Sequence, residues 1–122
     1  MAETFERLMA IVRDVDAHLD ANTAEAYRQQ PLAGHWARIT KVCEEAGEVW
    51  KALSKLTGEN PRKGRCGTEE ELLEELGDTA SAAWCAIQHI TKDEARTAEV
   101  IVAALEKAHR RVGEFAREAS HG

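Results

Sequence analysis

Residues 39–56 read ITKVCEEAGEVWKALSKL, and this stretch decides the fold of the chain. Apolar side chains recur in it at alternating spacings of three and four residues, the period of an amphipathic helix. The members of the stripe are Ile39, Val42, Ala46, Val49, Leu53 and Leu56. Gly58 and Pro61 follow, and both residue types are typical of a helix end. The stretch therefore predicts a helix that stops before Gly58.

Three further stripes repeat this spacing on either side. They comprise Phe5, Leu8, Val12, Val15 and Leu19; Leu72, Leu76, Ala83, Ile87 and Ile90; and Ala98, Ile101, Leu105, Ala108, Val112 and Phe115. No segment shows the period-two alternation of a β-strand. The sequence predicts one all-α domain over residues 1–122, a four-helix bundle. Apolar stripes on all four helices of so short a chain also favour a homodimer or homotetramer.

Helix starts and one loop are visible as well. Thr68 with Glu71, and Thr91 with Glu94, have the spacing of a capping box at a helix N-terminus. Residues 58–67 read GENPRKGRCG, which predicts a basic loop between the second and third helices.

Composition narrows the class of protein. The net charge of −6 argues against a nucleic-acid polymer as partner. No apolar run is long enough to cross a membrane, and the N-terminus does not have the pattern of a signal peptide. Cys43, Cys66 and Cys85 form no Cys-x-x-Cys pair, so we expect reduced thiols and a cytoplasmic location.

Two short segments repeat one arrangement of acids. Residues 45–48 read EAGE and residues 75–78 read ELGD, each with two acids three residues apart and a glycine between them. Acids at this spacing share one face of a helix. If the second and third helices pack antiparallel, four carboxylates converge on one cleft: Glu45, Glu48, Glu75 and Asp78. Gly47 and Gly77 indicate a close approach of backbone or ligand, although small-residue packing is an alternative.

A solvated helix face is the ordinary explanation of such acids. Residues 69–78, however, contain six acids and no base. The helix dipole accounts for acids in the first turn, but not for Glu75 and Asp78, which lie further along the helix. A hard divalent cation does account for them, because oxygen-only ligands select Mg²⁺, Mn²⁺ or Ca²⁺ over zinc.

These residues also resemble the signature of a known family. Glu44-Glu45-x-x-Glu48 followed by Glu75-x-x-Asp78 is similar to the motif of the MazG-like all-α nucleoside triphosphate pyrophosphohydrolases. The resemblance covers residues 35–90 and is closest over residues 41–56 and the loop that follows. It implies a MazG-type fold, with Glu45, Glu48, Glu75 and Asp78 as Mg²⁺ ligands and Glu44 as an auxiliary acid. The implied reaction cleaves an NTP or dNTP between the α and β phosphates, releasing pyrophosphate and a nucleoside monophosphate.

Supporting roles follow from that chemistry. Glu45, or failing it Glu44, is expected to accept the proton of the attacking water. Phosphate oxygens usually meet basic side chains. The candidates are Lys41, Lys55, Arg62, Lys63, Lys107, Arg110 and Arg111.

Other residues invite simpler interpretations. The three tryptophans project to the edge of their stripes opposite the acids, which favours core or subunit-interface packing for Trp36, Trp50 and Trp84. Ala52 and Ala82, on the acidic flank, leave room for a sugar or base. His89 is expected to be a polar surface residue.

Three other classes remain as alternatives. A non-catalytic, metal-binding regulatory or interaction module would keep the acids without turning over a triphosphate. A di-iron bundle needs Glu-x-x-His on two helices, and only Glu106-x-x-His109 fits. A purely structural bundle would bind no Mg²⁺.

Overall fold

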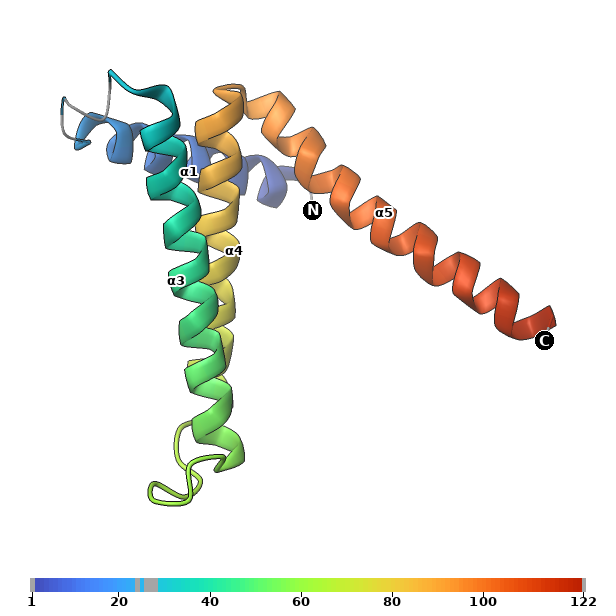
Figure 1. Cartoon of the computed structure of the whole chain (residues 1–122). Coiled ribbons are helices and arrows are strands. Elements are labelled where there is room, and N and C mark those ends of the chain that lie inside the picture. The colour runs from blue at the N-terminus through green and yellow to red at the C-terminus, as the bar shows by residue number, and fades with distance from the viewer. Residues whose placement is uncertain (1, 24, 26–28, 122) are drawn as a thin grey trace.

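A computed structural model describes residues 2–23, 25 and 29–121, and this part of the chain is helical without strands. The helices are α1 (Ala2–Ala21), α3 (Pro31–Thr57), α4 (Glu69–Thr91) and α5 (Glu94–His121). They pack together as Figure 1 shows, which confirms the all-α, four-helix prediction. None of the described helices combines the length and apolar character needed to cross a membrane.

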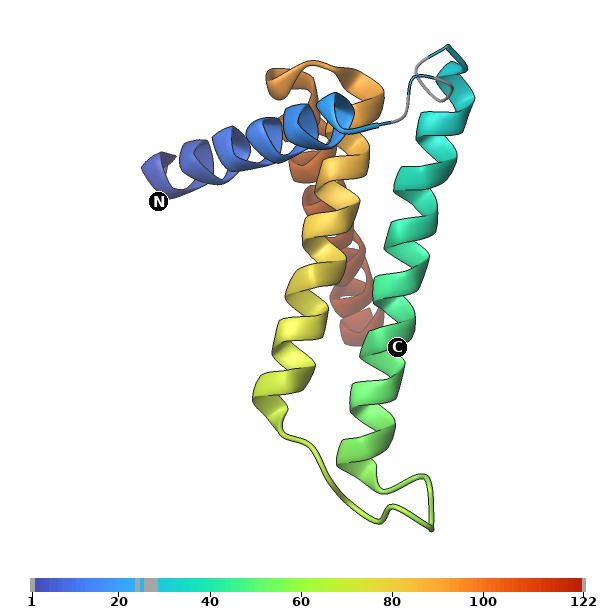
Figure 2. The same ribbon diagram turned by 90° about the vertical axis from the view of Figure 1, so that its left-hand side faces the viewer.

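The centre of the fold is the antiparallel pair of α3 and α4 (Figures 1 and 2). α3 ends where the sequence predicts, because Gly58 has the left-handed φ of 70° and its N–H donates to the carbonyl of Ser54. α4 begins at the predicted cap, where the Thr68 hydroxyl accepts a hydrogen bond from the N–H of Glu71 at 3.2 Å. The loop between these two caps lets the helices run side by side.

The start of α5 differs from the prediction. Thr91 is still part of α4, and its hydroxyl accepts a hydrogen bond from the N–H of Asp93, which precedes α5. The carboxylate of Asp93 instead accepts a hydrogen bond from the N–H of Arg96 at 3.1 Å. The predicted capping box of Thr91 and Glu94 is therefore wrong, because the nearer aspartate takes the capping position.

The core lies where α1 crosses the C-terminal part of α4 and meets the start of α5 (Figure 2). Its buried members are Met9, Val12, Cys85 and Ile101, with Trp84 and Ile87 packed against them. The packing role predicted for Trp84 is thus confirmed. Residues 105–121, the projecting half of α5, extend away from the other helices and are exposed (Figure 1).

Candidate metal centre

Three of the four predicted carboxylates come together between α3 and α4. Glu45 from α3 and Glu75 and Asp78 from α4 each offer an oxygen, and these oxygens lie within 4.8 Å of one another. The antiparallel pairing brings the two acid segments to the same level, as the repeated spacing predicts. We call these three residues the carboxylate cluster.

The negative charge of the cluster is only partly neutralised by its surroundings, because Lys41 pairs with Glu45 whereas the groups that act on Glu75 are other acids. Partial burial raises the pKa of Glu75, and the charges of Asp78, Glu48, Glu45 and Glu74 raise it further. A cation bound here would relieve that repulsion. Oxygen-only donors on two rigid helices fit a hard divalent ion such as Mg²⁺ or Mn²⁺.

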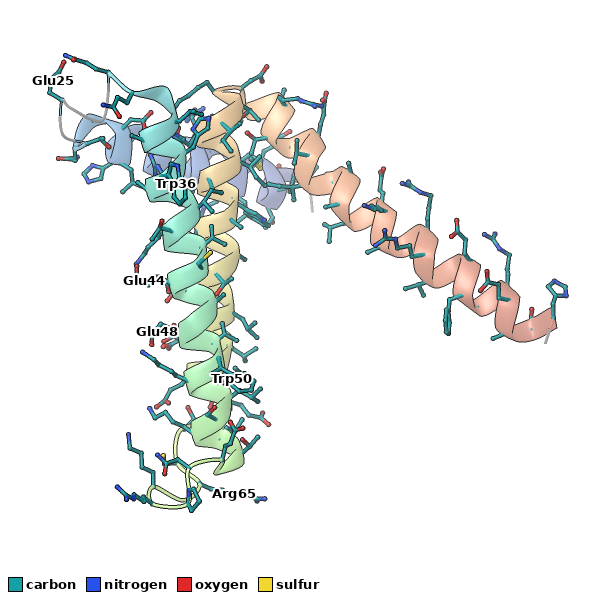
Figure 3. The ribbon with its side chains drawn as sticks, in the orientation of Figure 1. Glu25, Trp36, Glu44, Glu48, Trp50 and Arg65 are labelled. Carbon is teal, nitrogen blue, oxygen red and sulfur yellow. The ribbon has the colours of Figure 1, made fainter. Side chains whose placement is uncertain are left out.

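Glu48 and Glu44 lie beside the cluster, on the outward side of α3 (Figure 3). Glu48 accepts a hydrogen bond from Lys51 at 3.1 Å, and its charge still acts on Glu75. Glu44 pairs loosely with Lys41 at 3.7 Å and is well exposed. Both acids are therefore neighbours of the cluster and not members of it in this structure.

Lys41 links the cluster to a groove. Its Nζ donates to Oε1 of Glu45 at 2.7 Å, and this bond together with the charge of Glu44 raises the pKa of Lys41. Only 14% of the Glu45 side chain is exposed. A positively charged amine thus stands at the edge of the cluster that borders the groove.

The groove has a volume of about 660 Å³ and runs between α1, α3 and α4. Glu45 and Asp78 line it together with apolar side chains, so the carboxylate cluster opens into a mostly apolar hollow. Its lining residues from α1 and α4 include Val15, Leu19, Ser81, Ala82 and Cys85. Ala82 lines the groove, whereas Ala52 is buried and is not among its lining residues.

The other predicted phosphate ligands lie elsewhere in the single chain. Lys55 faces Glu71 at 3.7 Å near the loop. Arg62 and Lys63 belong to the exposed loop at the far end of the α3–α4 pair. Lys107, Arg110 and Arg111 lie on the projecting half of α5, away from that pair (Figure 1). Of the seven candidates, Lys41 alone is among the described residues that line the groove.

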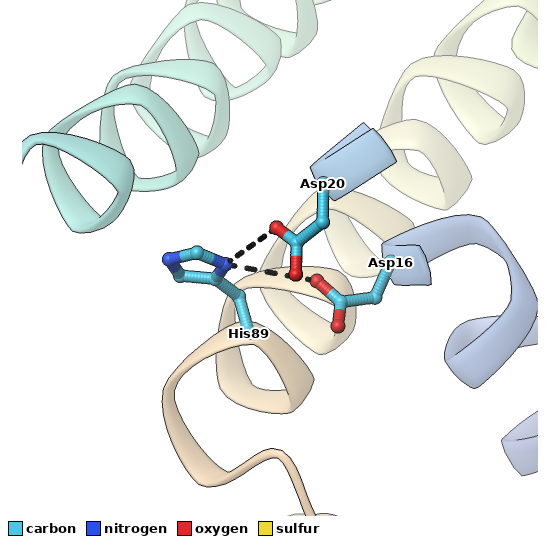
Figure 4. A group of neighbouring side chains, drawn as sticks. All are labelled: Asp16, Asp20 and His89. Carbon is cyan, nitrogen blue, oxygen red and sulfur yellow. Dashed lines mark hydrogen bonds and ion pairs between the residues drawn. The ribbon is translucent and has the colours of Figure 1, made fainter. Parts of the chain in front are cut away.

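A second polar cluster joins α1 to α4 and was not foreseen from the sequence. Asp16 and Asp20 of α1 face His89 of α4, whose Nδ1 lies 3.2 Å from Asp20 (Figure 4). The prediction that His89 is a surface residue is therefore wrong, since 12% of its side chain is exposed. Asp16 lies next to Val15, beside the predicted stripe of the first helix, and is buried together with Met9 and Val12, so the stripe gave no signal for it.

This second cluster already has its own cations. Arg38 pairs with Asp16 at 3.0 Å and with Asp20 at 3.1 Å, and Lys92 bonds to both aspartates. Although burial works in the opposite direction, hydrogen bonds from Lys92 and Arg38 lower the pKa of Asp20. The two carboxylates are thus neutralised, and the group acts as an ion-pair network that fixes α1 on α3 and α4.

The paired glycines of the acid segments find no close neighbour. A Cβ added at Gly47 or Gly77 would meet nothing within 4 Å. The close approach expected there is not made by the described part of this chain. Gly34 behaves differently, because a Cβ on it would lie 2.9 Å from Nε2 of His89.

Comparisons of the chain with protein-family models, with curated proteins and with solved structures found no match. The carboxylate cluster and the groove are therefore the features of this chain that bear on its function.

Proposed function

We propose that this protein is a Mg²⁺-dependent nucleoside triphosphate pyrophosphohydrolase that acts on an NTP or dNTP. The observation that carries the proposal is the convergence of Glu45, Glu75 and Asp78 within 4.8 Å at the mouth of the groove. A divalent ion held there would meet the phosphates of a ligand whose apolar end lies in the groove. Ligand sites of this kind combine an apolar hollow with a few polar groups.

Each part of such a substrate has a matching part of the site. The triphosphate lies at the carboxylate cluster and beside Lys41, and the nucleoside lies against Leu19 and Ala82. When bound, Mg²⁺ supplies charge neutralisation and a lowered pKa for coordinated water. Bare carboxylates would repel the phosphates, so binding of nucleotide requires the ion.

The chain's own residues hold the ion, orient the phosphates and move the proton. Glu75 and Asp78 act as holders on α4. Lys41 donates to a phosphate oxygen once it leaves Glu45, because its amine already stands at the edge of the cluster. Glu45 is the first choice for the group that accepts the proton of the attacking water, since it belongs to the cluster, and Glu44 is the second.

The test is a panel of NTPs and dNTPs with Mg²⁺, assayed for pyrophosphate and the monophosphate product. We expect release of pyrophosphate by the wild type and no turnover by Asp78→Asn. Glu70→Gln is the matched control, because Glu70 is an exposed acid in the first turn of α4, outside the cluster. It should hydrolyse like the wild type.

The panel also separates this function from the alternative. Mg²⁺ binding without turnover of any nucleotide would identify a non-catalytic metal-binding regulatory module. Equal turnover by the wild type and Asp78→Asn would contradict the assignment of the site. Membership of the MazG-like family and a cytoplasmic location are part of the same proposal, carried by the motif of residues 44–48 and 75–78 and by the free cysteines.

A further inference from the structure

The second polar cluster has the ligand atoms of a metal site as well as those of an ion-pair network. One such atom from each of Asp16, Asp20 and His89 lies within 4.8 Å of the other two. The two aspartates stand one turn apart on α1, so their carboxylates share one face of that helix. His89 of α4 faces both of them (Figure 4). The three side chains thus come from two helices that the core already holds together.

The separations between these atoms are close to those of the ligands of a bound ion. Nδ1 of His89 lies 3.2 Å from Oδ1 of Asp20 and 3.8 Å from Oδ1 of Asp16. In a tetrahedral zinc site with bonds of about 2.0–2.1 Å, neighbouring ligand atoms lie about 3.3 Å apart. His89 therefore already stands at about the distance from each carboxylate that such an ion requires.

The kinds of ligand atom distinguish this site from the carboxylate cluster. The carboxylate cluster offers only oxygen, which suits hard ions such as Mg²⁺. An imidazole nitrogen beside two carboxylates suits Zn²⁺ and neighbouring transition metals instead. Three protein ligands leave a fourth position on the ion for water. The two clusters should therefore select different metals.

A lysine amine marks the place that an ion would take. Nζ of Lys92 bonds to Oδ2 of both aspartates and lies 3.4 Å from Nδ1 of His89. It therefore contacts the same three side chains that would bind the ion. Half of the Lys92 side chain is exposed, so the amine can move into solvent. Arg38 is only 11% exposed and remains paired with the aspartates.

A histidine beside the cluster gives an independent indication of a ligand. The ring of His35 on α3 stands edge-on to that of His89, with 5.1 Å between the ring centroids. Its Nδ1 is buried and makes no hydrogen bond to any described residue. Buried polar atoms in folded proteins almost always have a partner. Water on a bound ion would bring a hydrogen-bonding group to the neighbourhood of this nitrogen.

We propose that Asp16, Asp20 and His89 form a binding site for Zn²⁺ or a similar transition-metal ion, which takes the place of the Lys92 amine. The double charge of the ion, at bonding distance from the carboxylates, offsets the loss of their pairs with the amine. The ion ties α1 to α4 directly, and α1 supplies a wall of the groove. Its role is structural and does not depend on the enzymatic activity.

Titration with Co²⁺ as a stand-in for Zn²⁺ tests this site. The titration uses the Asp78→Asn variant, in which the carboxylate cluster is weakened as a competing site. Co²⁺ reports binding because its visible absorption strengthens when an imidazole and carboxylates replace its water in a four-coordinate site. We expect saturable binding of one ion, and its loss when His89→Gln is added.

Lys92→Met, in the same Asp78→Asn background, tests the exchange of amine for ion. Without the competing amine, Co²⁺ and Zn²⁺ should bind about tenfold more tightly, because two ion pairs of a half-exposed lysine no longer have to break. Lys107→Met is the matched control, because Lys107 is exposed on the projecting half of α5. It should leave the affinity unchanged.

Unfolding of the wild type is a second measurement, which remains valid if a variant does not fold. Zn²⁺ should raise the unfolding midpoint, because an ion that binds only the folded chain stabilises it. A midpoint that does not respond to Zn²⁺ would overturn the proposal. So would Co²⁺ binding that survives His89→Gln, since the ion would then lie elsewhere, or a folded Lys92→Met that binds neither metal.

Discussion

Nζ of Lys41 lies 2.7 Å from Oε1 of Glu45, so the amine at the edge of the carboxylate cluster is bonded to one of the acids that would hold the metal. A metal ion bound at the cluster would compete with the lysine for this carboxylate. In the proposed reaction Lys41 would also contact a phosphate, so it would have two opposite effects on turnover.

Lys41→Met separates these effects. The amine of Lys41 is half-exposed, so loss of its ion pair with Glu45 should change the free energy of Mg²⁺ binding only modestly, and we expect Mg²⁺ affinity to rise about fivefold. Turnover of nucleotide should fall, because a phosphate contact is lost. Calorimetry with Mg²⁺ and a pyrophosphate assay measure the two quantities. A simultaneous loss of Mg²⁺ affinity would contradict this role.

Glu48→Gln should be milder than Asp78→Asn in its effect on metal binding. Glu48 is held by Lys51 and acts on the cluster from its edge, whereas Asp78 belongs to the cluster. Removing a group that supports metal ligands typically weakens metal binding about 10- to 100-fold, and removing a ligand costs more. Mg²⁺ titrations of both variants check the order. The reverse order would make Glu48 the principal ligand.

Asp16→Asn should destabilise the fold. Asp16 and Arg38 are buried, with side-chain exposures of 6% and 11%, and breaking a buried pair costs about 3 kcal/mol or more. Glu99→Gln is the control, because its pair with Arg96 is exposed and contributes less than about 1 kcal/mol. Unfolding in urea measures both variants. Equal effects would show that the network does not anchor α1.

Lowering the pH should destabilise the fold through the second polar cluster, which contains Asp20 and His89. Burial and the charge of Lys92 lower the pKa of His89 below its ordinary value of 6.5. Between the ordinary pKa of 6.5, which His89 has in the unfolded chain, and its lower pKa in the folded chain, only the unfolded chain binds the proton. The free energy of unfolding therefore falls as the pH falls through 6.5. The lowered pKa of Asp20 adds a further loss as pH falls through its ordinary 3.8. Urea unfolding across pH measures the slope, and His89→Gln should flatten its upper part. An unchanged slope in that variant would exclude His89 as the source.

Gly34→Ala should destabilise the protein even though alanine favours helices. The new Cβ would lie 2.9 Å from the ring of His89, which Asp20 holds in place, and overpacking of this kind costs about 1–3 kcal/mol. Gly113→Ala is the control, because nothing lies within 4 Å of its added Cβ. It should stabilise α5 by about 0.8–1 kcal/mol. Thermal unfolding compares the two, and stabilisation by Gly34→Ala would show that His89 moves freely.

Local patterns in the sequence were enough to predict the helices and three of the carboxylates. Stripes of period 3.6 located all four helices, and Gly58 and Thr68 marked the ends that bring Glu45 level with Asp78. These features depend on residues close in sequence, or on two helices joined by one short loop. The cap of α5 was missed because Thr91 and Asp93 both suit that position.

Contacts between distant segments could not be predicted in this way. The ion pairs of Asp16 with Arg38 and Lys92 join three helices, and no spacing within one helix shows which charges meet. The groove also depends on contacts between distant segments, since α1 supplies one of its walls. The exposure of Trp36 and Trp50 depends on where α1 and α5 pack, and the stripes alone do not specify this.

A Mg²⁺ titration of the wild type and of Glu75→Gln by isothermal calorimetry, with Glu70→Gln as control, tests the metal site most directly. We expect saturable binding by the wild type and the control, and its loss in Glu75→Gln, because the charges that act on Glu75 are those of other acids. No saturable binding by the wild type, or equal binding by Glu75→Gln, would contradict it.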